Sequence, residues 1–400
     1  MNILYIHQYF RTPAEPGPTR SYWVCKELIK QGHKVTMLTT NSSIEKSHRR
    51  DIEGIDVIYL KIPYDNKMGM LKRLIAFLKF MFRSTMLAFK EKNVDLVIAT
   101  STPLTIGFPA LMLKRFKKLP YLFEVRDLWP EVPIQMGGIK NPLIIKMAVA
   151  FERAIYKHAT HIIALSPGMA DGVKSAGVAD SKVTMIPNMS KIDEFWPRER
   201  NEQLCKDLGL RPESFKLIHF GSLGLANGAN TIVDSAILLN NNPDIDILFV
   251  GGGSTKDVLE SRCVEAGLTN VHFLGKFPMK IMSEIVNFCD VSIVSFMDLP
   301  ILYTNSPNKL FDSLSAGKPI IVNSAGWTKD LVEQNQCGYY VNPNKPQELV
   351  DRLLELSRSP QIIADMGTQS RKLAETKLDK SILCKQFCEV VKSLPVGKTA

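Results

Sequence analysis

The sequence predicts an α/β fold of two doubly wound, Rossmann-like domains, each with a parallel sheet covered by helices. Three observations predict it. Short apolar runs alternate with longer amphipathic stretches, which is the pattern of strand–helix–strand units. The alternation breaks once, where Pro187 and Pro197 flank a stretch without periodicity. The chain has 400 residues, 45% of them hydrophobic, which is enough for two cores of ordinary size.

The predicted strands are short, rich in Ile, Val and Leu, and bounded by Gly, Pro or polar residues. In the first domain we expect strands at residues 2–7, 34–40, 55–60, 94–100, 121–125 and 161–165. In the second we expect them at residues 216–220, 245–250, 271–274, 291–296 and 319–323. Helical patterns lie between most of them, for example at residues 20–31. The predicted domains are residues 1–187 and 188–375, and residues 376–400 form a helix that closes the fold.

Charge is distributed unevenly along the chain. The net charge is +10. Residues 1–190 carry 27 basic and 15 acidic side chains, whereas residues 191–400 carry 23 and 25. The basic character therefore belongs to the first domain, and it suggests an anionic partner there, such as a membrane surface, a phosphorylated substrate or nucleic acid.

Residues 67–92 have the pattern of a basic amphipathic helix. Lys72, Lys79, Arg83 and Lys90 form one stripe, and apolar side chains cover most of the remaining surface. This pattern fits a helix lying on an anionic bilayer surface. A helix packed on the sheet with a solvated basic edge has the same pattern. We expect the first, and therefore a protein that attaches to a membrane from one side.

The seven cysteines predict neither disulfides nor a zinc site. Their number is odd, no pair has C-x-x-C spacing, and Cys384 and Cys388 lack nearby histidines. Reduced thiols are typical of the cytosol. The N-terminus lacks a basic segment and reads as a strand, so we expect no signal peptide.

Two predicted strands of the second domain end in glycine-rich loops. Residues 221–228 (Gly-Ser-Leu-Gly-Leu-Ala-Asn-Gly) follow one strand, and residues 251–254 (Gly-Gly-Gly-Ser) follow the next. Glycines at strand ends let backbone amides approach an anion, although tight turns alone are the alternative. Neither loop matches the G-x-G-x-x-G or P-loop pattern, so dinucleotide and P-loop binding lose support.

Residues 305–319 carry the most informative pattern. Ser306 suits the cap of a helix whose first residue is Pro307. Lys309 and Asp312 then share one face near the helix start. An ammonium group there suits a diphosphate, and a carboxylate one turn later can accept hydrogen bonds from a ribose diol. A well-capped surface helix with an ordinary Lys/Asp pair has the same spacing.

These two loops and residues 307–319, in this order, resemble the donor half of the family 4 nucleotide-sugar glycosyltransferases. Residues 123–131 (Phe-Glu-Val-Arg-Asp-Leu-Trp-Pro-Glu) resemble the R-D-x-W-P-E signature of the subgroup that builds O-antigen and capsule repeats, which includes L-fucosamine and N-acetylhexosamine transferases. Residues 4–10 and 16–20 resemble the first strand and acceptor loop. The resemblance covers about residues 1–375. It implies the GT-B fold, in which two Rossmann-like domains face a central cleft.

The resemblance also implies site residues. The implied donor-binding residues are Gly221, Ser222, Leu223, Gly224, Gly252, Lys276, Phe277, Ser306, Pro307, Asn308, Lys309, Leu310 and Asp312. The implied catalytic residues are Asp127, Arg126 and Lys309, and His7, Gly17 and Arg20 would bind the acceptor. Two features depart from the family pattern. Thr304 stands where many members have a glutamate, and the stretch from Leu223 to Gly228 contains no cation, so Lys309 would carry more of the phosphate charge.

The function implied is a retaining hexosyltransferase of O-antigen, lipopolysaccharide or capsule assembly. It would move a sugar such as L-FucNAc, QuiNAc or GlcNAc from a UDP-sugar to an undecaprenyl-diphosphate-linked saccharide, on the inner face of the cytoplasmic membrane. No metal or other cofactor is implied, and the D-x-D at Asp244 and Asp246 begins a strand, where we expect a structural role. A nucleotide-sugar epimerase of the same architecture and a nucleic-acid- or membrane-binding module are the alternatives. Because no recognised nucleic-acid module appears, we expect no nucleic-acid partner.

Overall fold

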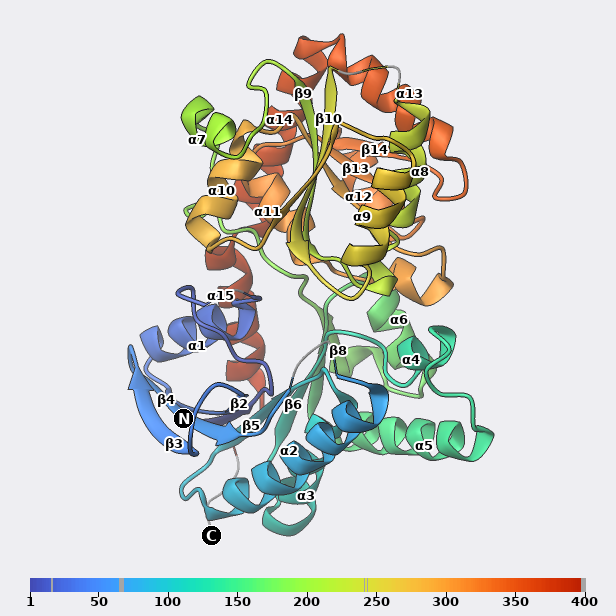
Figure 1. Ribbon diagram of the computed structural model, residues 1–400. Helices are drawn as coiled ribbons and strands as arrows, with labels where there is room; N and C mark the ends of the chain where they lie inside the picture. Colours follow the sequence, from blue (N-terminus) through green and yellow to red (C-terminus); the bar gives the residue numbers. More distant parts are fainter. Residues whose placement is uncertain (16, 65–67, 241, 243, 397–400) are drawn as a thin grey trace. The chain divides into compact units, whose positions relative to one another are not determined.

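The computed structural model describes residues 1–15, 17–64, 68–240, 242 and 244–396 (Figure 1). The chain forms two compact units. Unit 1 comprises residues 1–12, residues 17–187 and the chain from Ser381 onward, and unit 2 comprises residues 188–380 with a short segment that begins at Pro13. Most of α15 (Lys380–Ser393) therefore belongs to unit 1. There its buried Cys384 and Cys388 are neighbours of Cys25.

Unit 1 is built on a sheet that follows the order β3-β4-β2-β1-β5-β6-β7-β8. The strands are β1 (Asn2–Ile6), β2 (Lys34–Asn41), β3 (His48–Ile52), β4 (Ile55–Lys61), β5 (Leu96–Thr100), β6 (Tyr121–Val125), β7 (His161–Ala164) and β8 (Val183–Met185). Neighbouring strands are parallel except β3 and β4. The six strands predicted here are confirmed. The prediction missed β3, an exposed and charged edge strand, and the three-residue β8.

Helices cover both faces of this sheet. They are α1 (Arg20–Lys30), α2 (Met70–Lys90), α3 (Gly107–Lys117), α4 (Glu131–Gln135), α5 (Pro142–His158) and α6 (Pro167–Ser175). α1 connects β1 to β2 on one side of it in the sheet, whereas α2, α3 and α5 connect strands that follow in the opposite direction across the sheet. Because such crossovers are right-handed, α1 covers one face of the sheet and α2, α3 and α5 cover the other. Ring contacts of 6.4 Å from Phe82 to Phe108 and from Phe108 to Phe151 join these three helices. The amphipathic helix predicted over residues 67–92 is α2, and Lys67 lies outside the described residues.

Unit 2 has a parallel sheet in the order β11-β10-β9-β12-β13-β14. The strands are β9 (Phe215–Ser222), β10 (Ile245–Gly252), β11 (Val271–Gly275), β12 (Val291–Val294), β13 (Ile320–Val322) and β14 (Gly338–Tyr340). The five predicted strands are confirmed, and the short β14 was missed. The strand order reverses between β9 and β12, and ligands of such sheets bind outside the carboxyl ends of the strands at this point.

The helices of unit 2 bury both faces of the sheet. They are α7 (Glu202–Asp207), α8 (Asn230–Leu238), α9 (Lys256–Glu265), α10 (Met279–Phe288), α11 (Asn308–Ser315), α12 (Trp327–Gln334), α13 (Pro346–Ser357) and α14 (Pro360–Leu373). Alternate residues of one strand enter different cores: Leu217 joins one apolar cluster, and Ile218 and Phe220 join the other. Strands buried on both faces explain the continuous apolar runs in the sequence.

Two further observations bear on the sequence predictions. All seven cysteines are buried, and none of them is in a disulfide. Among the described residues, no helix combines the length and the apolar character that crossing a bilayer requires.

Candidate functional site

The glycine-rich loops of unit 2 pack backbone against backbone at the carboxyl ends of β9 and β10. A Cβ on Gly251 would lie 1.8 Å from the carbonyl oxygen of Gly221, and one on Gly253 would lie 2.3 Å from that of Leu223. The amide of Leu223 donates to Gly252 at 3.0 Å. Close packing therefore requires glycine at positions 251 and 253, whether or not a ligand binds there.

Lys309, in the first turn of α11, lies against this loop. A Cβ on Gly221 would be 3.7 Å from Lys309 Cε, and Lys309 Nζ lies 2.9 Å from Nε2 of the buried His219 on β9. Burial lowers the pKa of Lys309 to about 7. Burial and the Lys309 charge hold the pKa of His219 well below its ordinary value. His219 is therefore neutral, and its Nε2 accepts from Lys309 when the amine is in its ammonium form.

The half-charged amine and the loop amides form a place suited to an anion. A phosphate bound beside Lys309 would restore the charge that burial removes, because a nearby opposite charge favours the ammonium form. The structure brings together Lys309 and Gly221, whose donor roles stay predictions, and adds His219, which the sequence analysis missed. Its signal was a histidine inside an apolar strand, two positions before the glycine loop.

Asp312 points to a different partner. Its carboxylate lies 3.0 Å from Lys191 Nζ, and both side chains are buried. Burial raises the pKa of Asp312, and Lys191 opposes that shift. Burial also disfavours the charge of Lys191, but Asp312 and Glu194 raise the pKa of Lys191 above its ordinary value. The contact with Lys191 occupies Oδ1 of Asp312, and a bond from Asp312 to a ribose stays a prediction.

The segment around Lys191 also fixes the start and end of α11. The amide of Asn188 donates to Ser306 Oγ at 3.1 Å, and its side chain donates to the Ser306 carbonyl at 2.5 Å. The amide of Lys191 donates to Ser315 Oγ at 3.0 Å. The predicted capping of α11 by Ser306 is wrong, because Ser306 lies before the N-cap position, where its hydroxyl accepts from the Asn188 amide. The helix begins at Asn308, and its N-cap Pro307 makes no side-chain capping bond.

The remaining predicted donor residues differ in how far their side chains are exposed. Gly252 and Lys276 lie together, since a Cβ on Gly252 would be 3.0 Å from Lys276 Cε. Ser222 is exposed, and Gly224, Phe277, Pro307 and Asn308 are partly exposed. The side chains of Leu223 and Leu310 are buried, so only their backbone could meet a ligand.

In unit 1, the predicted catalytic residues lie where β1, β5 and β6 end. Thr102 donates to Asp127 Oδ2 at 2.8 Å. Burial raises the pKa of Asp127, and the bond from Thr102 and the charge of Arg126 oppose this shift. Arg126 Nη1 lies 3.5 Å from His7 Nε2. Because the strand order reverses around β1, this is the ligand position of the unit 1 sheet.

His7 belongs to the same group. Burial, with the charge of Arg126, holds the pKa of His7 well below its ordinary value. Its Nε2 faces Arg126, so the proton of the neutral ring is on Nδ1, which donates to Ser21 Oγ at 2.8 Å. Arg126 thus contacts His7, Asp127 follows Arg126 in the chain, and Thr102, the partner of Asp127, is the residue that sequence reasoning missed.

Arg20 is buried, and its hydrogen-bond partners all lie within unit 1. It is 2% exposed, and its Nε donates to the buried Glu124 at 2.8 Å. Its other nitrogens donate to the carbonyl oxygens of Pro187 and Ile186. These contacts tie α1 to β6 and to the end of unit 1, and they do not support the predicted contact with an acceptor. Gly17 has a φ of +132°, which favours glycine whatever its role.

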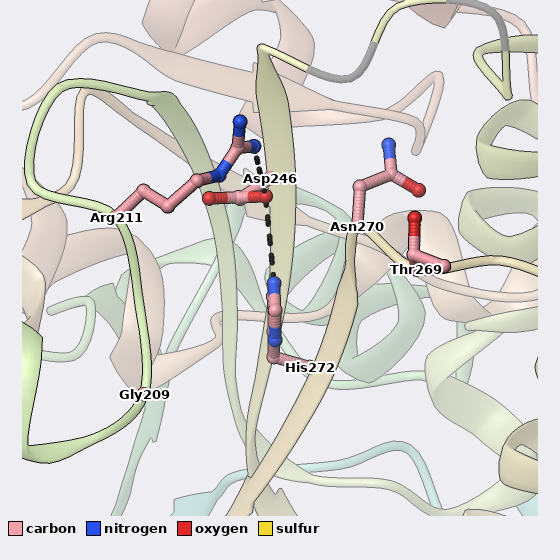
Figure 2. A pocket seen from close by; sticks show the side chains of 6 residues that line it. All are labelled: Gly209, Arg211, Asp246, Thr269, Asn270 and His272. Carbon is pink, nitrogen blue, oxygen red and sulfur yellow. Dashed lines mark hydrogen bonds and ion pairs between the residues drawn. The ribbon is translucent and has the colours of Figure 1, made fainter.

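A second polar group lies at the opposite, amino edge of the unit 2 sheet (Figure 2). A cavity of about 270 Å³ is lined there by Gly209, Arg211, Asp246, Thr269, Asn270 and His272. Buried Asp246 accepts from Arg211 at 2.9 Å and lies 3.4 Å from His272 Nε2. Figure 2 shows both side chains meeting at this carboxylate.

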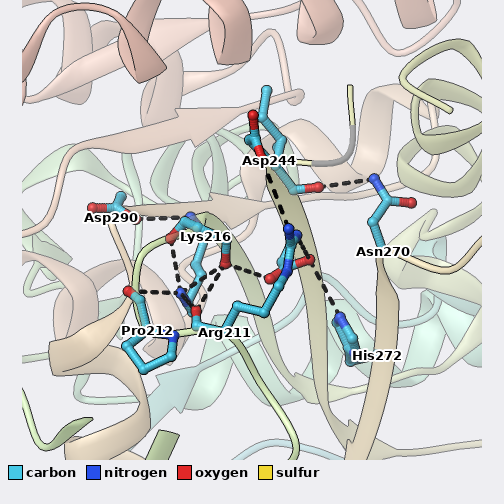
Figure 3. A network of polar contacts seen from close by, with 10 residues as sticks. Arg211, Pro212, Lys216, Asp244, Asn270, His272 and Asp290 are labelled. Carbon is cyan, nitrogen blue, oxygen red and sulfur yellow. Dashed lines mark hydrogen bonds and ion pairs between the residues drawn. The ribbon is translucent and has the colours of Figure 1, made fainter. Parts of the chain in front are cut away.

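Figure 3 follows this group through the segment before β9 and into the start of that strand. Buried Lys216 donates from Nζ to the Ser214 carbonyl at 2.8 Å, and its amide donates to Asp290 at 2.7 Å. Arg211 lies 3.8 Å from Asp244. The contacts fasten residues 211–216 to the sheet. They fit the structural role expected for the D-x-D motif, which lies at the edge away from the glycine loops.

Two sequence families match the chain. Residues 17–189 match the glycosyl transferase 4-like domain, and residues 201–373 match the glycosyl transferases group 1. The chain is a glycosyltransferase of the GT-B type. The predicted fold class and enzyme class of the transferase are thereby confirmed. The O-antigen subgroup, the donor and the acceptor stay predictions, and the matches support neither an epimerase nor a nucleic-acid-binding module.

The transferase resembles two sequence relatives and a solved structure at low sequence identity. It is 22% identical over 379 residues to the putative colanic acid biosynthesis glycosyl transferase WcaI of Escherichia coli K12, covering 90% of this chain and 92% of that protein. It is 23% identical over 255 residues to the alpha-galactosylglucosyldiacylglycerol synthase of Streptococcus pneumoniae, covering 62% of this chain and 65% of the relative, slightly less than two thirds. Its structure resembles Anabaena HepE in complex with UDP-glucose, with a TM-score of 0.73, 19% identity and coverage of 98% and 100%.

The first prediction concerns adjacent glycines of the transferase. Gly251→Ala places a methyl group into the Gly221 backbone at a φ of +150°, so we expect a loss of about 3 kcal/mol or more in unfolding free energy. In the control Gly252→Ala, the new methyl meets the flexible end of Lys276, and we expect less than about 1 kcal/mol. Urea unfolding measures both. Equal losses would contradict the backbone contact.

The second prediction concerns the buried ion pair. Asp312→Leu leaves Lys191 buried with Glu194 3.8 Å away, so we expect a loss of about 3 kcal/mol. In the double variant Lys191→Met/Asp312→Leu both members of the pair are gone and Glu194 keeps Lys380 at 3.6 Å, so at least half of the loss should return. Thermal and urea unfolding of the two variants decide it, and a double variant less stable than Asp312→Leu would refute the pairing.

Proposed function

We propose that this transferase moves a sugar from a UDP-sugar to a lipid-diphosphate-linked saccharide with retention of configuration, in O-antigen or capsule assembly. The sugar is an N-acetylated amino sugar such as L-FucNAc, QuiNAc or GlcNAc, and the lipid is undecaprenyl. One observation carries the donor part of the proposal. The Lys309 amine, paired only with a neutral imidazole among its described contacts, lies beside the glycine loop at the end of β9.

The proposed donor chemistry follows from this environment. When the bond between the sugar C1 and the β-phosphate oxygen breaks, negative charge grows on the diphosphate. A cation and backbone amides fixed there beforehand stabilise that charge without reorganising. UDP as the nucleotide is supported by the fold, since HepE of the same fold has been solved with UDP-glucose.

The acceptor hydroxyl then attacks C1 on the face that the diphosphate leaves, and its proton passes to the departing phosphate oxygen. This route needs neither a separate base nor a metal, so Asp127 orients the acceptor or stabilises positive charge on the sugar. The contact with Thr102 and the burial of the carboxyl hold Asp127 in place for either role.

A membrane-bound acceptor completes the proposal. WcaI, named for colanic acid biosynthesis, matches over most of both chains. The pneumococcal relative is named as the synthase of a glycosylated diacylglycerol, which is a lipid. In this chain, α2 carries Lys72, Lys79 and Lys90 on its exposed surface. Residues 67–92 therefore attach the transferase peripherally to the anionic inner face of the cytoplasmic membrane.

The third prediction tests Lys309 by pH. A bound diphosphate raises the pKa of Lys309 from about 7, so binding takes up a proton and affinity falls as the pH rises above 7, by up to about tenfold per unit. UDP-GlcNAc is the probe, because its esterified phosphates do not titrate near neutrality. Calorimetry between about pH 6 and 8.5 measures the slope.

Two variants of Lys309 sharpen this test. Lys309→Arg keeps a charge that does not titrate, so affinity should persist and the pH slope disappear. Lys309→Ala should lose about 10- to 100-fold in affinity. A slope that survives in Lys309→Arg, or an unchanged affinity in Lys309→Ala, would remove the donor assignment.

The fourth prediction separates catalysis from donor binding. Asp127→Asn should slow transfer by about 100-fold or more and change UDP-GlcNAc affinity by less than about twofold. Thr102→Val, which removes the donor to Asp127, should slow transfer less. Transfer of labelled sugar from UDP-GlcNAc into lipid extracts of acceptor-bearing membranes is the measurement. Asp171→Asn, an exposed carboxyl on α6, is the control, and an equal loss there would contradict the role of Asp127.

A further inference from the structure

Helices α2, α3 and α5 of unit 1 carry most of the large apolar side chains that the protein exposes. Eighteen large apolar side chains are exposed in the described part of the chain, and ten of them lie on α2, α3 and α5. They are Leu71, Leu74, Ile75, Leu78, Phe82, Met86, Phe116, Leu143, Ile144 and Met147. Single exposed apolar residues are ordinary, but a gathering on neighbouring helices marks an interaction surface.

On α2 the exposure has a regular geometry. One stripe is buried against the sheet and consists of Ala76, Phe80, Ser84 and Ala88. A second stripe, with spacings of 4, 3, 4 and 4, consists of Leu71, Ile75, Leu78, Phe82 and Met86. At these spacings the second stripe also lies on one helix face. The helix therefore has an apolar face beyond the one that the sheet covers.

The first half of α5 adds a second apolar element. None of residues 141–150 is buried, whereas the buried residues Ile155 and Tyr156 lie in the second half of the helix. The first two turns therefore project from the core. Leu143, Ile144 and Met147 in these turns are between 52% and 65% exposed.

The charge of the same helices defines the partner. α2, α3 and α5 contain eleven Lys and Arg residues but one acidic residue, Glu152. Burial raises the pKa of Glu152 to about 7, so this carboxyl is partly neutral near physiological pH. At the end of α3, the exposed Phe116 is surrounded by Arg115, Lys117 and Lys118. Exposed apolar groups among cations complement an anionic, apolar partner.

We propose that α2, the end of α3 and the first two turns of α5 form one bilayer-contact face, in which Phe116, Leu143, Ile144 and Met147 enter the headgroup–acyl boundary. The proposal rests on the proposed lipid-linked acceptor and extends the attachment beyond α2. The occupant is an anionic phospholipid surface. A second copy of the chain fits less well, because a two-fold contact would bring two strongly basic faces together.

Vesicle flotation of the full chain tests this face. The vesicles contain phosphatidylglycerol and phosphatidylcholine in equal parts, or phosphatidylcholine alone. The apolar variant is Leu143→Ser/Ile144→Ser/Met147→Ser, and the charge variant is Lys72→Glu/Lys79→Glu/Lys90→Glu. The matched control, Val258→Ser/Val264→Ser, removes side chains that are 61% and 79% exposed on α9 of unit 2. UDP-GlcNAc affinity and oligomeric state are measured for every variant.

We expect the wild type to bind the anionic vesicles at least about tenfold better than the neutral ones. The apolar variant should lose about tenfold or more, the charge variant about 100-fold or more, and the control less than about twofold. An apolar variant that binds like the wild type would restrict attachment to α2 and overturn the proposal.

Two other outcomes would also overturn it. Absence of vesicle binding by the wild type would remove the bilayer as the partner. A dimer that only the apolar variant dissociates, without vesicle binding, would make the face an interface between copies. Loss of the proposed function has a different signature, since it would appear as missing UDP-GlcNAc affinity in the wild type while vesicle binding remained.

Discussion

The proposed donor site of unit 2 depends on the buried ion pair between Lys191 and Asp312. Each charge is taken out of water, and each tolerates burial because the other is 3.0 Å away. The segment that carries Lys191 also binds Ser306 and Ser315, at the two ends of α11. The pair and these bonds hold α11 in one position on the sheet. That position places Lys309 against His219 and Gly221.

Two lysines near α11 illustrate how the partner decides the charge. Lys191 faces two carboxylates, Asp312 and Glu194, and its pKa lies above the ordinary value despite burial. Lys309 faces a neutral imidazole, and burial lowers its pKa to about 7. The first amine is satisfied by the protein, whereas the second lacks a counter-charge among its described contacts. The fold thus keeps one cation for stability and leaves another available to an incoming anion.

The sequence sufficed for features that depend on local pattern. Continuous apolar runs predicted eleven strands, the residues directly after them included Gly221 and Asp127, and the helix pattern of residues 305–319 indicated Lys309. Contacts between distant positions could not be predicted this way. The bond from Asn188 to Ser306 spans 118 residues, and it takes the hydroxyl that local spacing assigned to a cap. Arg20 likewise reads as an accessible loop residue, yet the distant Glu124 makes it a buried one.

The contrast between the two units connects the surface of the protein with its chemistry. Exposed apolar groups in water favour aggregation, and a basic face limits that by repulsion between copies. A face with both exposed apolar groups and basic residues binds an anionic bilayer, because the apolar groups are buried there and the cations are neutralised. Unit 2 has no excess of basic residues, as expected for a unit whose proposed ligand is a water-soluble nucleotide sugar. The proposed substrates would account for this difference, since the proposed acceptor lies in the membrane and the proposed donor is dissolved in water.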